Sequence, residues 1–170
     1  MSLPLDRLTI KARDAVMRAQ QSAQNRRHQF LSPLHLLASL LDERGGVVGS
    51  LFDRIGVDSA RLQGLVDGEL DRLPQVSGTG AEPAASPGLP ELFTEARRRA
   101  EAMGDSYLST EHLLLALTTC DDAAGRLLHL CAVEERDVLA ALELIRGNQQ
   151  VNDDTPEDKY DALAQYGKDL

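Results

Sequence analysis

The sequence predicts an all-α domain made of two similar four-helix halves, and three observations lead to that prediction. The chain is 42% hydrophobic but only 4% aromatic and contains no Trp, so Leu and Ala must build the interior, which favours packed helices. The stretch FLSPLHLLASLL, residues 30–41, returns 77 positions later as YLSTEHLLLALT, residues 107–118. No segment shows a convincing alternation of apolar and polar residues, which would indicate a strand.

The repeat continues beyond these two stretches. The identities join Leu31, Ser32, His35, Leu36, Leu37 and Leu40 to Leu108, Ser109, His112, Leu113, Leu114 and Leu117. Further along, the offset becomes 76, so that LFDRIGVD, residues 51–58, faces LLHLCAVE, residues 127–134. We therefore expect residues 5–73 and 90–147 to fold as superposable bundles, related by pseudo-twofold symmetry within one compact body.

The helices of the first half have recognisable starts. The first should begin at Thr9, whose hydroxyl can cap the N–H groups of the first turn. Ser32 followed by Pro33 predicts the start of the second, and Asp58 that of the last. The first helix carries the apolar residues Ile10, Val16 and Met17 and a stripe of small residues, Ala12, Ala15, Ala19 and Ala23.

The second half follows the same plan. Its first helix is expected to begin after Pro90 and to end near Gly104, which can adopt a left-handed terminating conformation. Ser109 predicts the start of the second helix, with Glu111 favoured by the helix dipole of the first turn, and Glu134 opens the last helix.

The composition divides the chain into four segments. Residues 1–73 form the first repeat and residues 90–147 the second. Between them, residues 74–89 are rich in Pro, Gly, Ala and Ser and are expected to be a linker. Residues 148–170 are acidic and have few core-forming side chains, so we expect them to begin the connection to a further module.

Charge argues against nucleic acid as a partner. The net charge is −9, and the only basic cluster, Arg97 to Arg99, would point in three directions on a helix. No apolar run could span a membrane and no secretory signal opens the chain, so a cytoplasmic protein without a membrane partner is expected. Cys120 and Cys131 are expected to be free thiols.

The residues give no sign of catalysis or of metal binding. His35 and His112 are repeat-related and precede Leu pairs, which is typical of structural histidines, so no metal is expected from the four histidines, His28, His35, His112 and His129. Ser32 and Ser109 are better explained as helix caps than as nucleophiles. No GxxxxGK[ST] phosphate loop occurs, so this chain is expected not to be an enzyme and to need no cofactor.

Several motifs occur in an order that resembles the paired N-terminal repeats of the Clp family of ATP-driven unfoldases, and in particular its disaggregase branch. They are LDRLT, SPLHLLASLL, RLPQVSGTG, GDSYLSTE and VNDDTPEDKYDALAQYGKDL. The resemblance implies that the whole protein is a hexameric ATPase using ATP and Mg, with two nucleotide-binding modules. Such a protein threads aggregated polypeptides in cooperation with the DnaK chaperone system. The present chain is expected to be monomeric.

The resemblance also implies a substrate-binding site. Thr9, Asp105 and Glu111 match positions that the family associates with substrate handling, and Leu92 and Phe93 are candidates for an apolar groove beside them. We expect the three polar residues to lie close together on the surface. The groove is expected to be more polar than in relatives, because this sequence has Glu95, Arg99 and His112 where they have apolar residues. The same three polar residues could instead only terminate helices.

Two other functions stay open at this point. The chain could be the N-domain of a protease-associated Clp unfoldase, which docks adaptors, although RLPQVSGTG argues against that. It could also be a free-standing helical scaffold without any motor. A phosphate loop shortly after Leu170 in the gene would argue against the scaffold.

Overall fold

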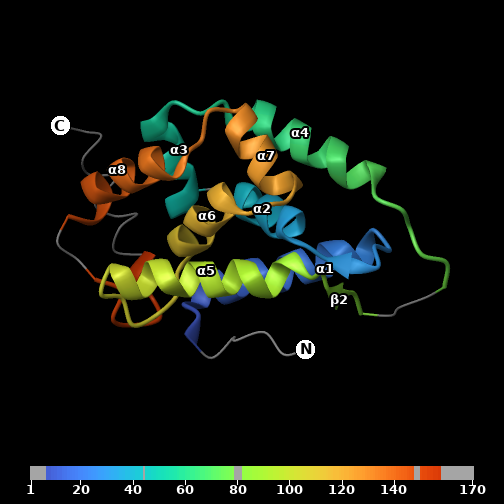
Figure 1. The fold of residues 1–170 in the computed structure, drawn as a ribbon, viewed down its shortest axis with the longest axis horizontal. Coiled ribbons are helices and arrows are strands. Elements are labelled where there is room, and N and C mark those ends of the chain that lie inside the picture. The colour runs from blue at the N-terminus through green and yellow to red at the C-terminus, as the bar shows by residue number, and fades with distance from the viewer. Residues whose placement is uncertain (1–6, 44, 79–81, 148–149, 158–170) are drawn as a thin grey trace.

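The computed structural model describes residues 7–43, 45–78, 82–147 and 150–157, and their fold is almost entirely helical. The first half contains α1 (Ile10–Asn25), β1 (Phe30–Leu31), α2 (Pro33–Asp42), α3 (Val47–Ile55) and α4 (Ser59–Arg72). The second contains β2 (Ala84–Ala85), α5 (Gly88–Ala102), α6 (Thr110–Thr119), α7 (Ala123–Leu130) and α8 (Glu135–Arg146). The long helices α1 and α5 run along one side of the molecule and pack on α2 and α6 (Figure 1). The predicted all-α fold is confirmed.

Most helix starts follow the capping signals in the sequence. The Thr9 hydroxyl accepts a hydrogen bond from the Ala12 N–H at 3.1 Å, and Asp58 caps α4 in the same way. At the starts of α2 and α6, each N-cap serine is hydrogen-bonded to the histidine three residues later in the sequence. His35 accepts from the Ser32 N–H at 3.1 Å, and His112 accepts from the Ser109 N–H at 2.9 Å. Each histidine takes the part that Glu or Gln plays in a capping box.

Helix α5 begins earlier than predicted. Its first residue is Gly88, not the residue after Pro90, and Leu89 already donates to the Ser86 carbonyl at 3.1 Å. Pro90 is compatible with this because the N–H groups of a first helical turn have no partner within the helix. The other end agrees with the prediction, since Gly104 follows α5 in a left-handed conformation with φ of +73°.

The two halves meet through reciprocal backbone pairing. Leu8 pairs with Leu108, and the residues at the repeat-related positions 77 residues away, Ala85 and Leu31, pair with each other. The Thr9 N–H donates to the Leu108 carbonyl at 3.0 Å, and the repeat-related bond from Ser86 to Leu31 measures 2.8 Å. Each half thus contributes a short extended segment that pairs with the other half, as expected for a pseudo-twofold relation. The strands β1 and β2 were not predicted because two residues are too few to show an alternation.

The core is continuous across both halves. It includes the second-helix leucines Leu36, Leu37 and Leu40 and their counterparts Leu113, Leu114 and Leu117, all at most 2% exposed. Every residue from Thr110 to Thr118 is buried, so α6 is a central helix surrounded by others. Its first turn, which carries Glu111, is therefore inside the molecule.

Helix α1 packs through small residues. Ala12, Ala15, Ala19 and Ala23 are buried, which lets neighbouring helices approach closely, as expected. Val16 is buried as well, but Ile10 and Met17 are 43% and 56% exposed and lie outside the core. No described helix has the length and apolarity needed to cross a lipid bilayer.

The residue boundaries predicted for the two repeats, the linker and the acidic segment stay predictions. The segment predicted as a linker contains β2 and the start of α5. Of the predicted acidic connection, only residues 150–157 belong to the described part of the chain.

Candidate functional site

The structure brings the three predicted polar residues to neighbouring positions. Thr9 precedes α1, Glu111 lies in the first turn of α6, and the pairing of Leu8 with Leu108 places these two helix starts side by side. Asp105 lies in the connection between α5 and α6. The expectation that they lie on the surface is wrong, because Thr9 and Glu111 are 0% exposed and Asp105 is 8% exposed.

They are covered by residues 150–157, which we call the strap. The Ile10 N–H donates to the Asp154 carbonyl at 2.9 Å, and the Ser106 N–H donates to the Val151 carbonyl at 2.8 Å. The Val151 N–H in turn donates to the Asp105 carboxylate at 2.9 Å. The Val151 side chain is fully buried. The strap is therefore held by backbone hydrogen bonds near its start and by an apolar anchor.

Asp105 is the centre of a buried charged network. Its carboxylate receives two hydrogen bonds from the Arg146 guanidinium, at 2.6 and 2.9 Å, and one from the His112 Nε2 at 2.7 Å. Burial by itself raises the pKa of Asp105. The hydrogen bonds from His112, Arg146 and the Val151 N–H outweigh it and hold the pKa well below the usual range. Asp105 is therefore an ionised anchor for α8, α6 and the strap.

A second carboxyl group, that of Glu157, ends the described strap in a buried pocket. The Thr9 hydroxyl donates to its Oε2 at 2.7 Å, and the Thr110 N–H donates to the same oxygen at 3.3 Å. Burial is the main reason that the pKa of Glu157 is raised to about 7, and the negative charge of Glu111 adds to the effect against the bonds from Thr9 and Thr110. Glu157 is thus held close to its point of half-ionisation at neutral pH.

The pocket is incompletely satisfied. The Ser109 hydroxyl bonds to Oε1 of Glu111. Oε2 of Glu111 and Oε1 of Glu157 are buried, and neither has a hydrogen-bond partner in the described structure. Two carboxyl groups with one unpaired oxygen each is an arrangement that costs free energy unless a proton or another donor is present.

His35 and His112 have structural roles at helix starts, as the sequence predicted. The pair His28–His35 in the first half, with ring nitrogens 2.8 Å apart, corresponds by the repeat to Asp105–His112 in the second. Burial, followed by the positive charges of His28 and Arg26, lowers the pKa of His35 to about 4. In the described residues no three His, Cys, Asp or Glu side chains gather as metal ligands would.

The apolar candidates lie beneath the surface. Leu92 and Phe93 are 2% and 3% exposed on α5. Leu92 borders a cavity of about 370 Å³, beside which Arg99 bonds Glu95 at 2.9 Å and Glu135 at 3.1 Å. The position and polarity of the groove, and the role of Leu92 and Phe93 in binding, stay predictions.

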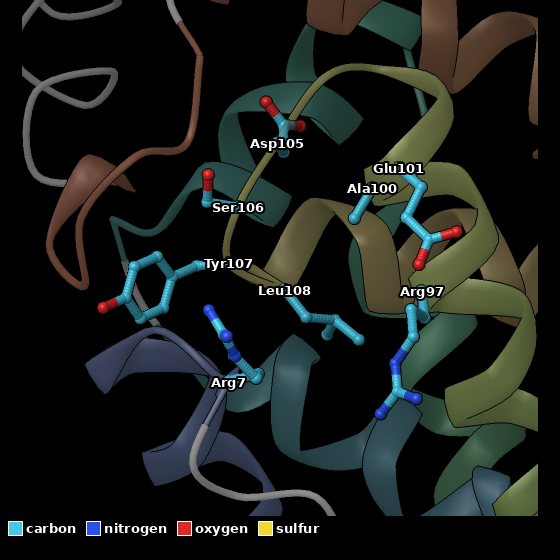
Figure 2. Close-up of a pocket in the computed structure, with 8 residues that line it drawn as sticks. All are labelled: Arg7, Arg97, Ala100, Glu101, Asp105, Ser106, Tyr107 and Leu108. Carbon is cyan, nitrogen blue, oxygen red and sulfur yellow. The ribbon is translucent and has the colours of Figure 1, made fainter.

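A larger cavity of about 400 Å³ adjoins Asp105 and the residues that hold the strap. Arg97 and Glu101 project from α5 at one side of it, and Arg7 and Tyr107 lie at the other (Figure 2). The lining of this cavity therefore carries both positive and negative groups.

Sequence reasoning missed the strap, Glu157 and Arg146. The strap has few apolar residues and no helical or strand periodicity, so nothing in its pattern indicates that it packs on the domain. Arg146 looked like an ordinary cation in the last turn of a helix. The repeat carried one available signal, since Asp105 takes the place of His28 and thereby introduces a charge that needs a buried partner.

Comparison with known proteins identifies relatives for most of the chain. Residues 7–131 match the family described as "Clp repeat (R) N-terminal domain". Over its whole length the chain is 36% identical to the chaperone protein ClpB of Rhodopirellula baltica. The fold is similar to that of the N-terminal domain of Hsp104 from Candida albicans, with a TM-score of 0.78 and 21% identity, covering 88% of this chain and 98% of that one.

A further solved structure has a similar fold, the N-terminal domain of the ClpV1 ATPase from an Escherichia coli type VI secretion system. Its TM-score is 0.69 at 26% identity, and the match covers 84% of this chain and 88% of that one. The present chain spans only 19% of the length of the Rhodopirellula baltica relative.

Proposed function

The chain belongs to the Clp repeat N-terminal domain family, and from this premise we propose that it captures unfolded or aggregated polypeptide for a larger ATP-driven chaperone. The observation that carries the proposal is the seat of the strap. There, the first turn of α1 and the connection before α6 already hold another segment of the chain through its backbone atoms. A site that accepts one segment through backbone atoms is suited to accept another.

The chemistry of this seat fits a partner of variable sequence. The Ile10 and Ser106 N–H groups and the Asp105 carboxylate bind backbone atoms, which every polypeptide offers. Backbone hydrogen bonds supply affinity without selecting a sequence. Thr9, Asp105 and Glu111 would therefore line the polypeptide site, and Leu92 and Phe93 are candidates for its apolar contacts.

The remaining parts of the proposal concern the whole protein. As the family resemblance implies, the captured chain would be passed to hexameric ATPase modules that use ATP and Mg and act with the DnaK system in the cytoplasm. The present chain by itself would be monomeric and would hydrolyse no ATP.

Our first prediction tests capture with a substitution that changes little else. Glu111→Gln keeps the size of the side chain but removes its charge and replaces one acceptor oxygen by a donor N–H group. We expect it to weaken the binding of fluorescein-labelled casein, an unfolded polypeptide, in an anisotropy titration. Glu143→Gln removes the same charge from an exposed position of α8 and should leave the affinity as it is.

Two outcomes would contradict this prediction. If the unmodified chain shows no saturable binding of casein, capture of unfolded polypeptide is wrong, and a folded adaptor becomes the better partner to test. If casein binds but both variants bind it equally well, the site lies elsewhere on the domain.

A further inference from the structure

The pocket around Glu157 does not suit a carboxylate. It offers two donors, the Thr9 hydroxyl and the Thr110 N–H, to a single oxygen. The carboxyl group of Glu111 is close enough for its charge to raise the pKa of Glu157, and its buried Oε2 has no hydrogen-bond partner within the described structure. Two carboxylates side by side in a buried site repel each other, so one of them must take up a proton to remain there.

An amide group would satisfy the same pocket without a proton from solvent. Its carbonyl oxygen would accept from Thr9 and Thr110, as Oε2 of Glu157 does now. Its N–H would donate toward the unpaired oxygen of Glu111. Because an amide is neutral and carries one acceptor and at least one donor, it meets both requirements of the pocket at once.

We propose that the pocket formed by Thr9, Thr110 and Glu111 recognises an amide group of a bound polypeptide, and that the strap is the chain's own occupant of this site. The inference rests on the proposed function and adds to it the chemical group that is recognised. The amide can come from a Gln or Asn side chain or from the peptide backbone. Glu157 fills the pocket as an imperfect substitute.

The other contacts of the strap indicate what else the ligand requires. Val151 places a fully buried apolar side chain six residues before Glu157. Between them the Asp154 carbonyl binds the Ile10 N–H, while Asn152 and Thr155 are exposed. A ligand for this seat is therefore a short segment that follows the bent path of the strap, with an apolar residue at one end and an amide at the other. It excludes the strap, because both need Thr9 and Thr110.

The pocket's preference predicts an unusual effect of Glu157→Gln. The substitution supplies the amide, so the strap should bind more tightly. At pH 7.5 the Ile10 and Ser106 amides, which donate to the strap, should exchange with deuterium at least about tenfold more slowly, because each unit of pKa mismatch that the substitution removes corresponds to a factor of about ten. Casein, which competes with the strap, should bind more weakly by a similar factor. Glu143→Gln is the matched control.

The opposite change is made at the other end of the strap. Val151→Asp places a second carboxylate in a buried position beside Asp105 and should release the strap, so that Ile10 and Ser106 exchange faster and casein binds more tightly. Asn152→Asp adds the same charge at the exposed neighbouring position and should have neither effect. A circular dichroism spectrum unchanged from that of the parent chain verifies that the Val151 variant is folded. If it is not, Glu157→Gln decides alone.

The results separate this inference from the proposed function. If Glu157→Gln fails to slow the exchange of Ile10, the pocket has no preference for an amide and the inference is overturned. If it slows exchange but leaves casein affinity equal to that of Glu143→Gln, the strap does not cover the polypeptide site. If casein binds to none of the chains, Val151→Asp included, capture is wrong, whereas slower exchange would still establish the amide preference.

Discussion

At the scale of single residues, the second half of the domain carries charges that the first half lacks. His28 and Asp105 occupy equivalent positions, yet only Asp105 brings a buried ion pair, with Arg146. The carboxyl groups of Glu111 and Glu157 form a second buried acidic cluster nearby. In both halves, the second ring nitrogen of the capping histidine has a hydrogen-bond partner. That partner is His28 in the first half and Asp105 in the second.

Substitution of Asp105 should therefore lower the free energy of unfolding far more than it would if Asp105 lay on the surface, as the sequence predicted. Asp105→Ala leaves Arg146 buried without its carboxylate, and breaking a buried ion pair in this way typically costs about 3–5 kcal/mol. The repeat offers a matched comparison, His28→Ala, which removes the partner of His35 and should cost about 1–3 kcal/mol. Urea unfolding of both variants measures the difference. Equal losses would show that the Arg146 pair contributes little.

The pH dependence of strap binding follows from Glu157. Its pKa is raised from 4.5 to about 7 when the strap is bound, so the bound form holds more protons than the released form between these values. Stability that depends on an extra bound proton declines as pH rises through that window and is constant above it. We expect the free energy that holds the strap to fall by about 1–3 kcal/mol from pH 4.5 to pH 7.

The measurement is the protection of the Ile10 amide, corrected for the intrinsic rate at each pH. Glu111 is the main charged group that faces Glu157, and Asp105 stays ionised between pH 4.5 and pH 7. Glu157→Gln should abolish the dependence. Protection that rises toward pH 7, or a dependence that persists in this variant, would contradict the role of Glu157.

At the scale of elements, the parts with strong local signals could be predicted. The capping residues Thr9, Ser32, Asp58 and Ser109 mark helix starts in the structure, because a cap depends on neighbours three residues away or fewer. The strands depend instead on pairing with distant segments, and so does the placement of Ser86 before α5, whose N–H donates to the Leu31 carbonyl. The local sequence does not indicate which distant segments will pair.

The candidate site shows the same division. Its three polar residues could be placed near one another from the repeat and the family resemblance. Their burial could not, because it depends on the strap, which is anchored by hydrogen bonds and a single valine rather than by a periodic apolar face. Arg99 is a comparable case, since its bonds to Glu135 of α8 make it a link between helices rather than part of a solvated cluster.

At the scale of the whole molecule, the reciprocal pairing makes the halves depend on each other. Leu8 and Leu31 each pair with the opposite half, and one hydrophobic core runs through both. The halves are therefore expected to unfold together, even though each has its own set of four helices.

Repeat-related leucines test this cooperativity. Leu37→Ala and Leu114→Ala remove equivalent, fully buried side chains from α2 and α6, and each should lower the free energy of unfolding by about 2–5 kcal/mol. Because the halves share a core, Leu37→Ala should speed global deuterium exchange of amides in α6 as much as in α2, and Leu114→Ala should do the same. Faster exchange confined to the mutated half would show that the repeats unfold independently. In that case the pairing at Leu8 and Leu31 would join two separate folding units, since it would be too weak to couple them.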